Sequence, residues 1–426
     1  MLSKETNELV TRSGLGSPLG SLMRRYWIPI ALASELPEPD CPPIRVRVLG
    51  EKLVAFRDSS GRVGLLEEFC AHRGASLFLG RNEEFGLRCV YHGWKYDVHG
   101  KCLEQPNEPP ENSFKEKIHL LSYPTIETGE VVWAYMGGDG KIPALPKFEW
   151  TQVPSTHRYV SKTWQECNWL QALEGGIDSG HSSFLHRALQ TGIPGDGNIG
   201  WTGWRIKAAA PKHEVQLTDY GFVYAAIRHL GEEGNFVKVY HYIMPFHTFF
   251  AFQLGASGEI YRPEIHGHMF VPMDDENCMI YNLLYRFAGD PFTEKEIDEI
   301  ERLRGRGPGE QTSNFRKTAN KDNDWRIDRK AQKSHSFTGI RGINNQDHAV
   351  QESMGPIVDR SREHLGSSDQ ATISMRRFLT AAIKTVESGG DPPGISALHK
   401  VRAVEKLLPN GVQWLDALRD EIYPTW

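Results

Sequence analysis

Two short segments decide the fold of this chain: Cys70-Ala71-His72 and, after sixteen further residues, Cys89-Val90-Tyr91-His92. Each segment supplies one cysteine and one histidine. A Rieske [2Fe–2S] centre needs this set of ligands, because two thiolates bind one of its irons and two imidazoles bind the other. A glycine follows each pair, Gly74 and Gly93, and allows the loop backbone to approach the cluster sulfurs closely. The pattern therefore predicts a Rieske cluster held by two loops.

Zinc is the first alternative for such a set. Zinc sites usually place their cysteines two to four residues apart and their histidines likewise, whereas each pair here mixes the two residue types. Chance placement of core cysteines is the second alternative. The remaining cysteines are scattered, which suits a reducing cytoplasm better than a disulfide framework; they are Cys41, Cys102, Cys167 and Cys278.

The composition is that of an ordinary soluble protein. The 426 residues suffice for two or three domains with a large core, 39 % of them are hydrophobic, and the net charge is −5. No basic excess indicates nucleic-acid binding, and no apolar run approaches the roughly 18 residues of a membrane span. Residues 1–6 lack the apolar region of a signal peptide. We therefore expect a cytoplasmic protein that binds neither nucleic acid nor membranes.

Alternating apolar residues predict a small antiparallel β domain around the cluster loops. Turn residues at 58–61 separate two of its strands, and prolines at 143, 146 and 154 mark its end. The expected strands are 44–48, 52–56, 63–68, 94–97, 101–103 and 131–135.

The glycine-rich stretch 14–20 does not have the pattern of a nucleotide site. A dinucleotide fingerprint lies between a strand and a helix, but no strand precedes this stretch and Pro18 interrupts it. A loop is the expected structure. NAD(P)H would then act only through a separate reductase that delivers electrons to this chain.

A second metal site is predicted in the segment 164–186. Glu174, Asp178 and His181 follow at i, i+4 and i+7, the spacing of one helix face. His186 comes five residues after His181, so a bulge or a helix end must bring the two imidazoles together, and nearby glycines favour such a distortion. Two imidazoles and one carboxylate form the facial triad of non-haem Fe(II) oxygenases. Histidines of a core or an interface are the alternative interpretation.

The carboxylate of such a triad must come from far along the chain. Asp347 is our candidate, in the segment 345–352 at the start of an apparent helix. A carboxylate in that position can also serve only as a helix N-cap. Asp359 and Asp328 are the alternative ligands.

The rest of the chain continues with strands and then helices. The glycine-rich stretch 304–312 is expected to be a mobile loop near the entrance of the site. The expected strands are 214–217, 222–229, 236–243, 249–254, 266–271 and 279–287, and the expected helices are 294–302, 348–354 and 373–388.

With both sites identified, the chain resembles the Rieske non-haem iron aromatic-ring-hydroxylating oxygenases. Within them it is similar to the α (oxygenase) subunits of the phthalate dioxygenase-like group, which have only α subunits. The similarity covers nearly the whole length. Besides the cluster motif it rests on segments 24–29, 168–186, 320–325, 346–356 and 359–361.

The resemblance implies an α+β architecture. An N-terminal antiparallel β Rieske [2Fe–2S] domain would be followed by a catalytic domain with a twisted antiparallel sheet around helices, a helix-grip or Bet v1-like fold. The implied divisions are an N-terminal segment 1–40 packing on the catalytic domain, a Rieske domain 41–145 and a mononuclear non-haem iron domain 146–426.

The resemblance also implies roles for the site residues. Cys70 and Cys89 would bind one iron of the cluster, and His72 and His92 the other. The mononuclear Fe(II) would be bound by His181, His186 and Asp347. The family pattern of an aspartate followed five residues later by a glutamate is met by Glu352.

Asp178 would be the bridging carboxylate of the family. It would accept a hydrogen bond from His181 and from a cluster histidine of the neighbouring subunit, expected to be His92, and so give the electron a short path. In the family arrangement the two centres of one chain are too far apart, which implies a closed ring, a homotrimer or a stacked hexamer. A solvated helix carboxylate is the alternative for Asp178.

The resemblance implies an enzyme that cis-dihydroxylates an aromatic carboxylate with O₂. A carboxylate in an apolar pocket needs a cation or several donors. Phthalate enzymes are expected to use two arginines on the sheet, where this chain has Lys207 and Met244; Arg205 is a further candidate contact. Lysine can hold one carboxylate as a point charge, and methionine can only pack against the ring. A substituted benzoate such as 3-chlorobenzoate is therefore expected in preference to phthalate or isophthalate.

Other functions stay open at this point. An O-demethylating monooxygenase of methoxy- or phenoxybenzoates would carry the same metal motifs. A Rieske electron carrier is the alternative of another class, which the chain length and the second iron motif disfavour. A sensor built on an inactive oxygenase is disfavoured because no ligand is missing.

Overall fold

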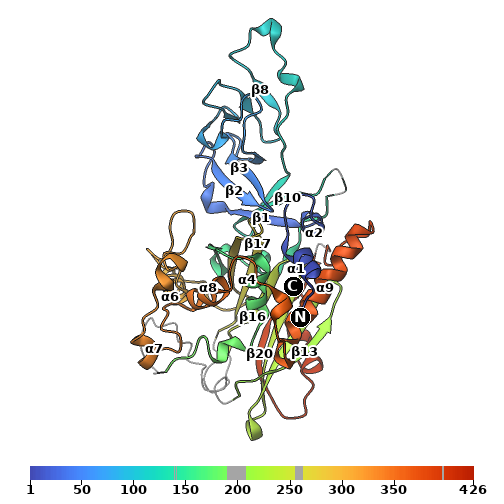
Figure 1. Ribbon diagram of the computed structural model, residues 1–426, viewed down its shortest axis with the longest axis vertical. Coiled ribbons are helices and arrows are strands. Elements are labelled where there is room, and N and C mark those ends of the chain that lie inside the picture. The colour runs from blue at the N-terminus through green and yellow to red at the C-terminus, as the bar shows by residue number, and fades with distance from the viewer. Residues whose placement is uncertain (139, 141, 190–207, 255–261, 396–397) are drawn as a thin grey trace. The chain divides into compact units, whose positions relative to one another are not determined.

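The computed structural model describes residues 1–426 except 139, 141, 190–207, 255–261 and 396–397 (Figure 1). The chain divides into two compact units: unit 1 comprises residues 1–12 and 144–426, and unit 2 comprises residues 13–143. The expected N-terminal segment 1–40 is therefore divided. Only its first helix, α1 (Lys4–Thr11), belongs to unit 1, where the side-chain amide of Asn168 donates to the Thr11 carbonyl oxygen at 3.0 Å.

Unit 2 is built from small antiparallel sheets, as the alternating pattern predicts. One short helix, α2 (Pro18–Arg24), precedes them. One sheet has the order β1 (Trp27–Leu32), β10 (Val131–Tyr135), β9 (Thr125–Thr128); the second has the order β2 (Ile44–Val48), β3 (Glu51–Arg57), β4 (Val63–Glu67); the third has the order β5 (Arg81–Glu83), β6 (Gly86–Arg88), β7 (Lys95–Tyr96), β8 (Cys102–Glu104).

The core of unit 2 lies directly beneath the two cysteine-containing loops. Phe56, Leu87 and Trp94 are almost fully buried in one cluster of apolar side chains. Cys70 and Cys89 are members of that same cluster, with 3 % and 2 % of their surface exposed. The loops are thus anchored by burial of the sulfur atoms themselves.

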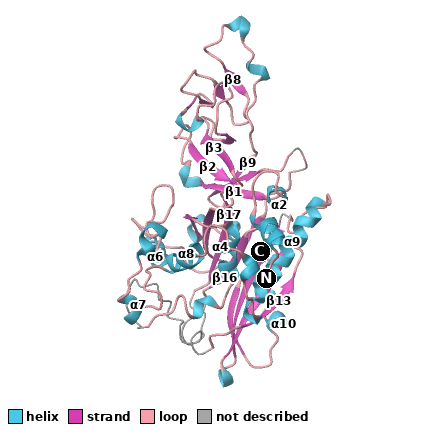
Figure 2. Cartoon of the chain, in the orientation of Figure 1, coloured by secondary structure: helices cyan, strands magenta, loops and turns pink. Residues whose placement is uncertain are grey.

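Unit 1 contains one antiparallel sheet of eight strands (Figure 2). Seven strands follow one another in hydrogen-bonded order, and the eighth pairs with β15. The order is β12 (Arg158–Gln165), β18 (Cys278–Arg286), β17 (Glu264–Pro272), β16 (His247–Ala251), β15 (Asn235–Ile243), β14 (Gly221–His229), β13 (Lys212–Leu217), with β20 (Val404–Leu408) beside β15. A separate parallel pair is formed by β11 (Lys147–Phe148) and β19 (Leu398–His399).

Helices pack on this sheet. Helix α4 (Trp169–Ile177) lies against β16, β17 and β18, and α9 (Gln370–Glu387) lies against β13 and β14. The other α-helices among the described residues are α3 (Glu149–Gln152), α6 (Glu294–Arg304), α7 (Ala331–Ser334), α8 (Ile343–Ser353), α10 (Trp414–Ala417) and α11 (Arg419–Ile422). The predicted α+β architecture of two β-rich parts, the second with helices on an antiparallel sheet, is confirmed. Among the described residues, no helix combines the length and the apolar character needed to cross a membrane.

Helix α9 shows why these elements form where they do. Met375, Leu379 and Ile383 recur every fourth residue and are fully buried against the sheet. This spacing places them on one face of the helix, so their burial fixes its orientation. The predicted helix 373–388 therefore corresponds to α9, which begins three residues earlier.

Candidate metal centres

The two cysteine loops of unit 2 share one hydrogen-bonding pattern. The amide of Cys70 donates to the carbonyl of Ala75, and that of Gly74 donates back to Cys70, both at 2.9 Å. In the second loop, the amide of Cys89 donates to the carbonyl of Trp94 at 2.8 Å, and the amide of Gly93 donates to the carbonyl of Cys89 at 2.9 Å. The two glycines have φ values of 72° and 79°, which side-chain-bearing residues rarely adopt. Both predicted loops therefore form, and both are closed by their own backbone.

The histidines of these loops face one another. The rings of His72 and His92 lie 4.4 Å apart between centroids, and the indole of Trp94 stacks on His72 at 4.6 Å. His72 Nδ1 is buried and has no hydrogen-bond partner among the described residues. A buried ring nitrogen without a partner is costly, so this atom fits a metal ligand.

Two thiols and two imidazoles thus gather at the end of these loops. Burial raises the pKa of the Cys89 thiol, and the neighbouring Cys70 raises it further. Tyr96 Oη lies 3.2 Å from Cys70 Sγ, within hydrogen-bonding distance of the sulfur. The donor set fits a [2Fe–2S] cluster with two sulfur and two nitrogen ligands, and Tyr96 can donate to one of the sulfurs.

The second site lies in unit 1, where helix α4 ends. The helix stops at Ile177, and Asp178 follows in an extended conformation with φ −69° and ψ 124°. His181 begins a short 3-10 turn, His181–Ser183. The interpretation of Glu174, Asp178 and His181 as one helix face is therefore wrong. The helix end that was expected to bring His181 and His186 together is present.

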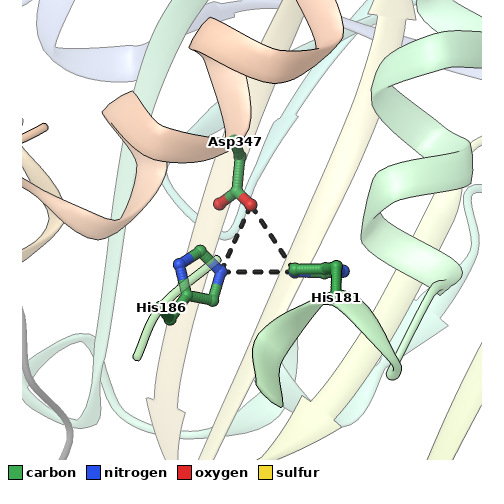
Figure 3. A group of neighbouring side chains, drawn as sticks. All are labelled: His181, His186 and Asp347. Atoms are coloured by element: carbon green, nitrogen blue, oxygen red, sulfur yellow. Dashed lines mark hydrogen bonds and ion pairs between the residues drawn. The ribbon is translucent and has the colours of Figure 1, made fainter. Parts of the chain in front are cut away.

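The third side chain comes from α8, on the far side of the site (Figure 3). Asp347 is four residues inside this helix, which begins at Ile343, so it is not an N-cap. His181 Nε2 and His186 Nε2 are 3.2 Å apart, and they lie 3.5 Å and 3.2 Å from Asp347 Oδ1. The structure therefore brings together the three side chains that the sequence selects.

Hydrogen bonds at the Nδ1 atoms of the two histidines fix the direction in which their Nε2 atoms point. The Nδ1–H of His186 donates to Gln346 Oε1 at 2.8 Å, while the amide nitrogen of Gln346 donates to the Ile340 carbonyl at 2.9 Å. The Nδ1–H of His181 donates to Asp178 Oδ2 at 3.3 Å. Each Nε2 then carries a lone pair, and each lone pair points at the space shared with Asp347.

Asp347 Oδ1 is buried and accepts no hydrogen bond from any described residue. Three acceptor atoms thus converge at one site. This arrangement fits a divalent transition metal held by two imidazoles and one carboxylate.

Asp178 accepts hydrogen bonds from the turn that follows it, which includes His181. Its Oδ1 accepts from the Gly180 amide at 2.6 Å, and its Oδ2 accepts from the His181 amide at 3.2 Å. Burial would raise the pKa of Asp178, but the hydrogen bonds from His181 and from these amides lower it to about 2. The side chain is therefore an ionised acceptor that fixes the position of His181.

The remaining carboxylates considered from the sequence have other partners. Glu174 is held by Arg360 at 2.8 Å and by Arg376 at 2.6 Å. Asp359 and Asp328 accept backbone hydrogen bonds at the starts of short helical turns. Neither aspartate joins the three converging side chains.

A cavity opens from the three converging side chains between helices α4 and α8 and the face of the sheet. Five strands of the sheet line it, and where a strand supplies two residues they are alternate ones, as expected for one face of a pleated sheet. Its walls are mostly aromatic or apolar, but two cations also line it. The wall includes Lys238, Phe250, Phe252, Phe270, Ile280 and Arg304.

Of the substrate residues expected from the sequence, only Met244 lies within the described part of the chain. Lys207 and Arg205 lie outside the described residues. Met244 follows β15 and is not among the described cavity residues; its sulfur instead accepts a hydrogen bond from Tyr242 Oη at 3.1 Å. Tyr240 does line the cavity, and Met244 is four residues farther on, about 13 Å along an extended strand. The expectation that Met244 packs against a ring here is therefore corrected.

The cations of the wall were missed from the sequence. Lys238 was one residue of an expected strand, and Arg304 was assigned to a loop. A capping signal could have placed Arg304, because Thr293 and Glu296 form a capping box at the start of α6 and Gly305 ends that helix in a left-handed conformation.

Comparison with known proteins now identifies the chain. Residues 26–124 match the Rieske [2Fe–2S] domain, and residues 134–420 match the family described as LigXa C-terminal domain like. The chain belongs to the Rieske non-haem iron oxygenases. It is an oxygenase subunit of their phthalate dioxygenase-like group, as the resemblance implied.

Relatives along the whole chain include two dioxygenase subunits. The 3-chlorobenzoate-3,4-dioxygenase oxygenase subunit of Comamonas testosteroni is 37 % identical over 441 positions, covering 99 % of this chain and 98 % of that protein. The phthalate 4,5-dioxygenase oxygenase subunit of Pseudomonas putida is 35 % identical over 426 positions, covering 98 % and 94 %. Among solved structures, dicamba monooxygenase bound to dicamba has the same fold, with a TM-score of 0.60, 18 % identity and coverage of 86 % of this chain and 98 % of that one.

Membership of this family implies the cofactors that the donor sets fit. They are a Rieske [2Fe–2S] cluster and a mononuclear iron, with electrons supplied by a separate reductase. The chain is thus one component of an oxidoreductase.

Proposed function

We propose that this chain is the terminal oxygenase that cis-dihydroxylates an aromatic carboxylate, with a substituted benzoate such as 3-chlorobenzoate as substrate. The observation that carries the proposal is the convergence of His181 Nε2, His186 Nε2 and Asp347 Oδ1 on a cavity with aromatic walls. Relatives named for 3-chlorobenzoate and phthalate support the substrate class.

In this proposal Cys70, His72, Cys89 and His92 hold the cluster, and His181, His186 and Asp347 hold the iron. The iron supplies oxygen activation when bound, and the cluster supplies electrons one at a time. The protein's own contribution is to bind the ring, orient one edge toward the iron site and exclude water.

The side chains of the cavity perform these tasks. Phe250, Phe270 and Ile280 form apolar walls that fit the faces of an aromatic ring. Asp178 and Gln346 hold the Nδ1 protons of the two histidines and thereby keep both Nε2 atoms directed at one point.

Asp178 has a second role in the proposal. It would also bond the cluster histidine His92 of a neighbouring subunit, so that the enzyme works as a closed homotrimer or a stacked hexamer. Its ionised state supports this, since a carboxylate with two oxygens can accept from two imidazoles at once.

The mass of the product formed under ¹⁸O₂ tests the function. The complete system would contain reductase and NADH, with 3-chlorobenzoate, benzoate, phthalate and 3-methoxybenzoate as separate substrates. Two labelled oxygens in a diol of a monocarboxylate are expected. Labelled diol from phthalate alone would overturn the monocarboxylate assignment.

O-demethylation is the second candidate. It is favoured by the relative named 5,5'-dehydrodivanillate O-demethylase oxygenase subunit, from Sphingobium sp. (strain NBRC 103272 / SYK-6), which is 31 % identical over 418 positions and covers 96 % of this chain and 86 % of that protein. Formaldehyde together with an unlabelled phenol from 3-methoxybenzoate, and no diol from any benzoate, would assign this reaction instead.

A further inference from the structure

Arg304 is placed in the cavity wall by the end of helix α6. Gly305 terminates the helix with φ 74°, and a Cβ added there would meet the side chain of Asn345 at 2.5 Å. The end of α6 is therefore in close contact with α8, the helix that carries Asp347. This close approach holds the last residue of α6 beside the iron-site cavity.

Arg304 differs from three other buried arginines of unit 1 in its charged partners. Arg286, Arg360 and Arg376 each have a carboxylate oxygen within 2.6–2.8 Å. Arg304 is 8 % exposed, and its nearest polar contact is His266 Nδ1 at 3.4 Å. No carboxylate of the described residues forms an ion pair with it.

Two of the neighbouring acids are already engaged, and the third, Asp347, is one of the three converging side chains of the candidate iron site. Glu301 forms an ion pair with Arg306, and Glu264 binds Arg286 at 2.8 Å. Burial, followed by the nearby Arg306, lowers the pKa of Arg304 to about 10, so its guanidinium is still charged at neutral pH. A buried charge is normally paired, and here no described carboxylate lies close enough to Arg304 to form an ion pair with it.

A second cation lies on the same wall. Lys238 Nζ lies 3.9 Å from the ring centroid of Phe252, and the Arg304 guanidinium carbon lies 5.3 Å from that centroid. Lys238 is 2 % exposed. His268, also on the wall, stays neutral because burial and the neighbouring arginines lower its pKa to about 3. The wall beside Phe252 is therefore positively charged.

This charge sits next to apolar surface that suits a ring. The planar fork of a guanidinium matches the two oxygens of a carboxylate. A neutral ligand cannot form this charged, two-oxygen contact. An aromatic acid can place its carboxylate at the cations and its ring against Phe250 and Phe270, in the same cavity as the iron ligands.

We propose that Arg304, with Lys238 beside it, binds the carboxylate of an aromatic monoacid and so decides which substrates enter the cavity. The inference rests on the proposed function for the reaction itself. It assigns substrate recognition to the end of α6 and to β15. One cationic wall beside apolar walls fits one carboxylate.

Anaerobic equilibrium binding tests this without turnover. The full-length enzyme, loaded with cluster and iron, would be titrated with 3-chlorobenzoate and with its neutral isostere 3-chlorobenzamide. We expect the acid to bind more tightly. Arg304→Gln should weaken acid binding by about 10- to 100-fold, the range of a lost hydrogen bond to a charged group, and leave amide binding nearly unchanged.

The matched control lies on the same helix. Arg302 is exposed and forms an ion pair with Asp298 at 2.8 Å, so Arg302→Gln removes an arginine two residues away without touching the cavity. It should bind both ligands as the parent does. Arg304→Lys keeps the charge without the fork and should lose less acid affinity than Arg304→Gln, while Lys238→Met should also weaken the acid selectively.

Several outcomes would overturn the inference. Equal losses of acid and amide affinity in Arg304→Gln, together with loss of mononuclear iron, would mean that Arg304 supports Asp347 instead. Unchanged acid affinity in Arg304→Gln and Lys238→Met, or tighter binding of benzenesulfonate than of benzoate, would also reject it.

If Arg304-dependent acid binding occurs but no acid is oxidised under ¹⁸O₂, the proposed function fails and the binding site stands. Oxidation of the acid together with Arg304-independent binding would mean that the proposed function stands and the binding site fails.

Discussion

The two metal sites of this chain are built in opposite ways. In unit 2, four candidate ligands lie within residues 70–92, on two loops that each close through their own backbone hydrogen bonds. In unit 1, His186 and its partner Gln346 are 160 residues apart, and three separate elements must meet. The first site depends on local loop geometry and the second on the packing of α8 near α4. The consequences of mutation should therefore differ between them.

The largest effect is expected when a cluster thiol is removed. Cys89→Ser should eliminate the visible spectrum of the Rieske cluster and all turnover, because one iron would lose a proposed thiolate ligand. It should also destabilise unit 2, since Cys89 is part of its core cluster. Visible absorption and iron analysis check this, with the mononuclear iron expected to remain.

Cys41→Ser is the matched control. Cys41 is a buried cysteine of the same unit outside both loops, and its loss should leave the spectrum intact. A Cys89→Ser protein with a normal Rieske spectrum would show that the cluster ligands are misassigned.

The next effect separates the second site from the first. His186→Ala should abolish turnover and remove the mononuclear iron while leaving the Rieske spectrum at parent intensity, because the two sites lie in different units. Iron content per cluster is the measurement. His229→Ala changes an exposed histidine that contacts Asn235 and should alter neither quantity. Loss of the cluster spectrum in His186→Ala would contradict the independence of the two sites.

The same contrast explains what the sequence could predict. The cluster motif was recognisable because its geometry is set within each loop, and alternating residues marked most strands. The end of α4 was not marked in the same way. Spacing alone put Glu174 on the face of Asp178 and His181, but Arg360 and Arg376, from distant segments, hold Glu174 elsewhere.

Asp347 and Arg304 show the two outcomes of reasoning about distant residues. Asp347 was selected because a facial triad needs a carboxylate and the family pattern supplied its position, although the start of its helix was misplaced. Arg304 was missed because the glycines after it suggested a loop. Its burial depends on contacts between α6 and α8, which no local pattern encodes.

A smaller effect is expected at the residue that orients His181. Asp178→Asn should keep both metal sites but lower turnover by about 10- to 100-fold, because an amide offers one acceptor oxygen where the carboxylate offers two. Single-turnover product from a reduced enzyme checks the electron path directly. Near-normal product in that experiment would reject the bridging role of Asp178.

Gln346 provides the matching test at His186. Gln346→Leu removes the acceptor of the Nδ1 proton while leaving all three ligands in place, and should weaken iron binding by about 10- to 100-fold. Competition with an Fe(II) chelator measures it. Gln346→Glu restores an acceptor oxygen and should recover part of the affinity. An unchanged affinity in Gln346→Leu would mean that the packing of α8 alone aims His186.

The smallest effect is expected at Tyr96, whose hydroxyl contacts the candidate cluster ligand Cys70 without taking part in the backbone hydrogen bonds that close the loops. Burial raises the pKa of Tyr96, so its hydroxyl stays protonated and can donate to Cys70 Sγ at 3.2 Å. Such a bond favours the reduced, more negative cluster. Tyr96→Phe should therefore lower the reduction potential by about 20–65 mV, the one-electron equivalent of a net hydrogen bond of about 0.5–1.5 kcal/mol.

Cluster content should not change in Tyr96→Phe, because the backbone bonds of the loops stay intact. Tyr123→Phe, which removes a hydroxyl bound to Glu51 in the same unit, is the control and should leave the potential unaltered. A lost cluster in Tyr96→Phe would show that the first site also depends on a side-chain support, as the iron site does. A shifted potential at full occupancy would mean that side-chain partners tune the cluster, whereas at the iron site they decide how tightly the metal is held.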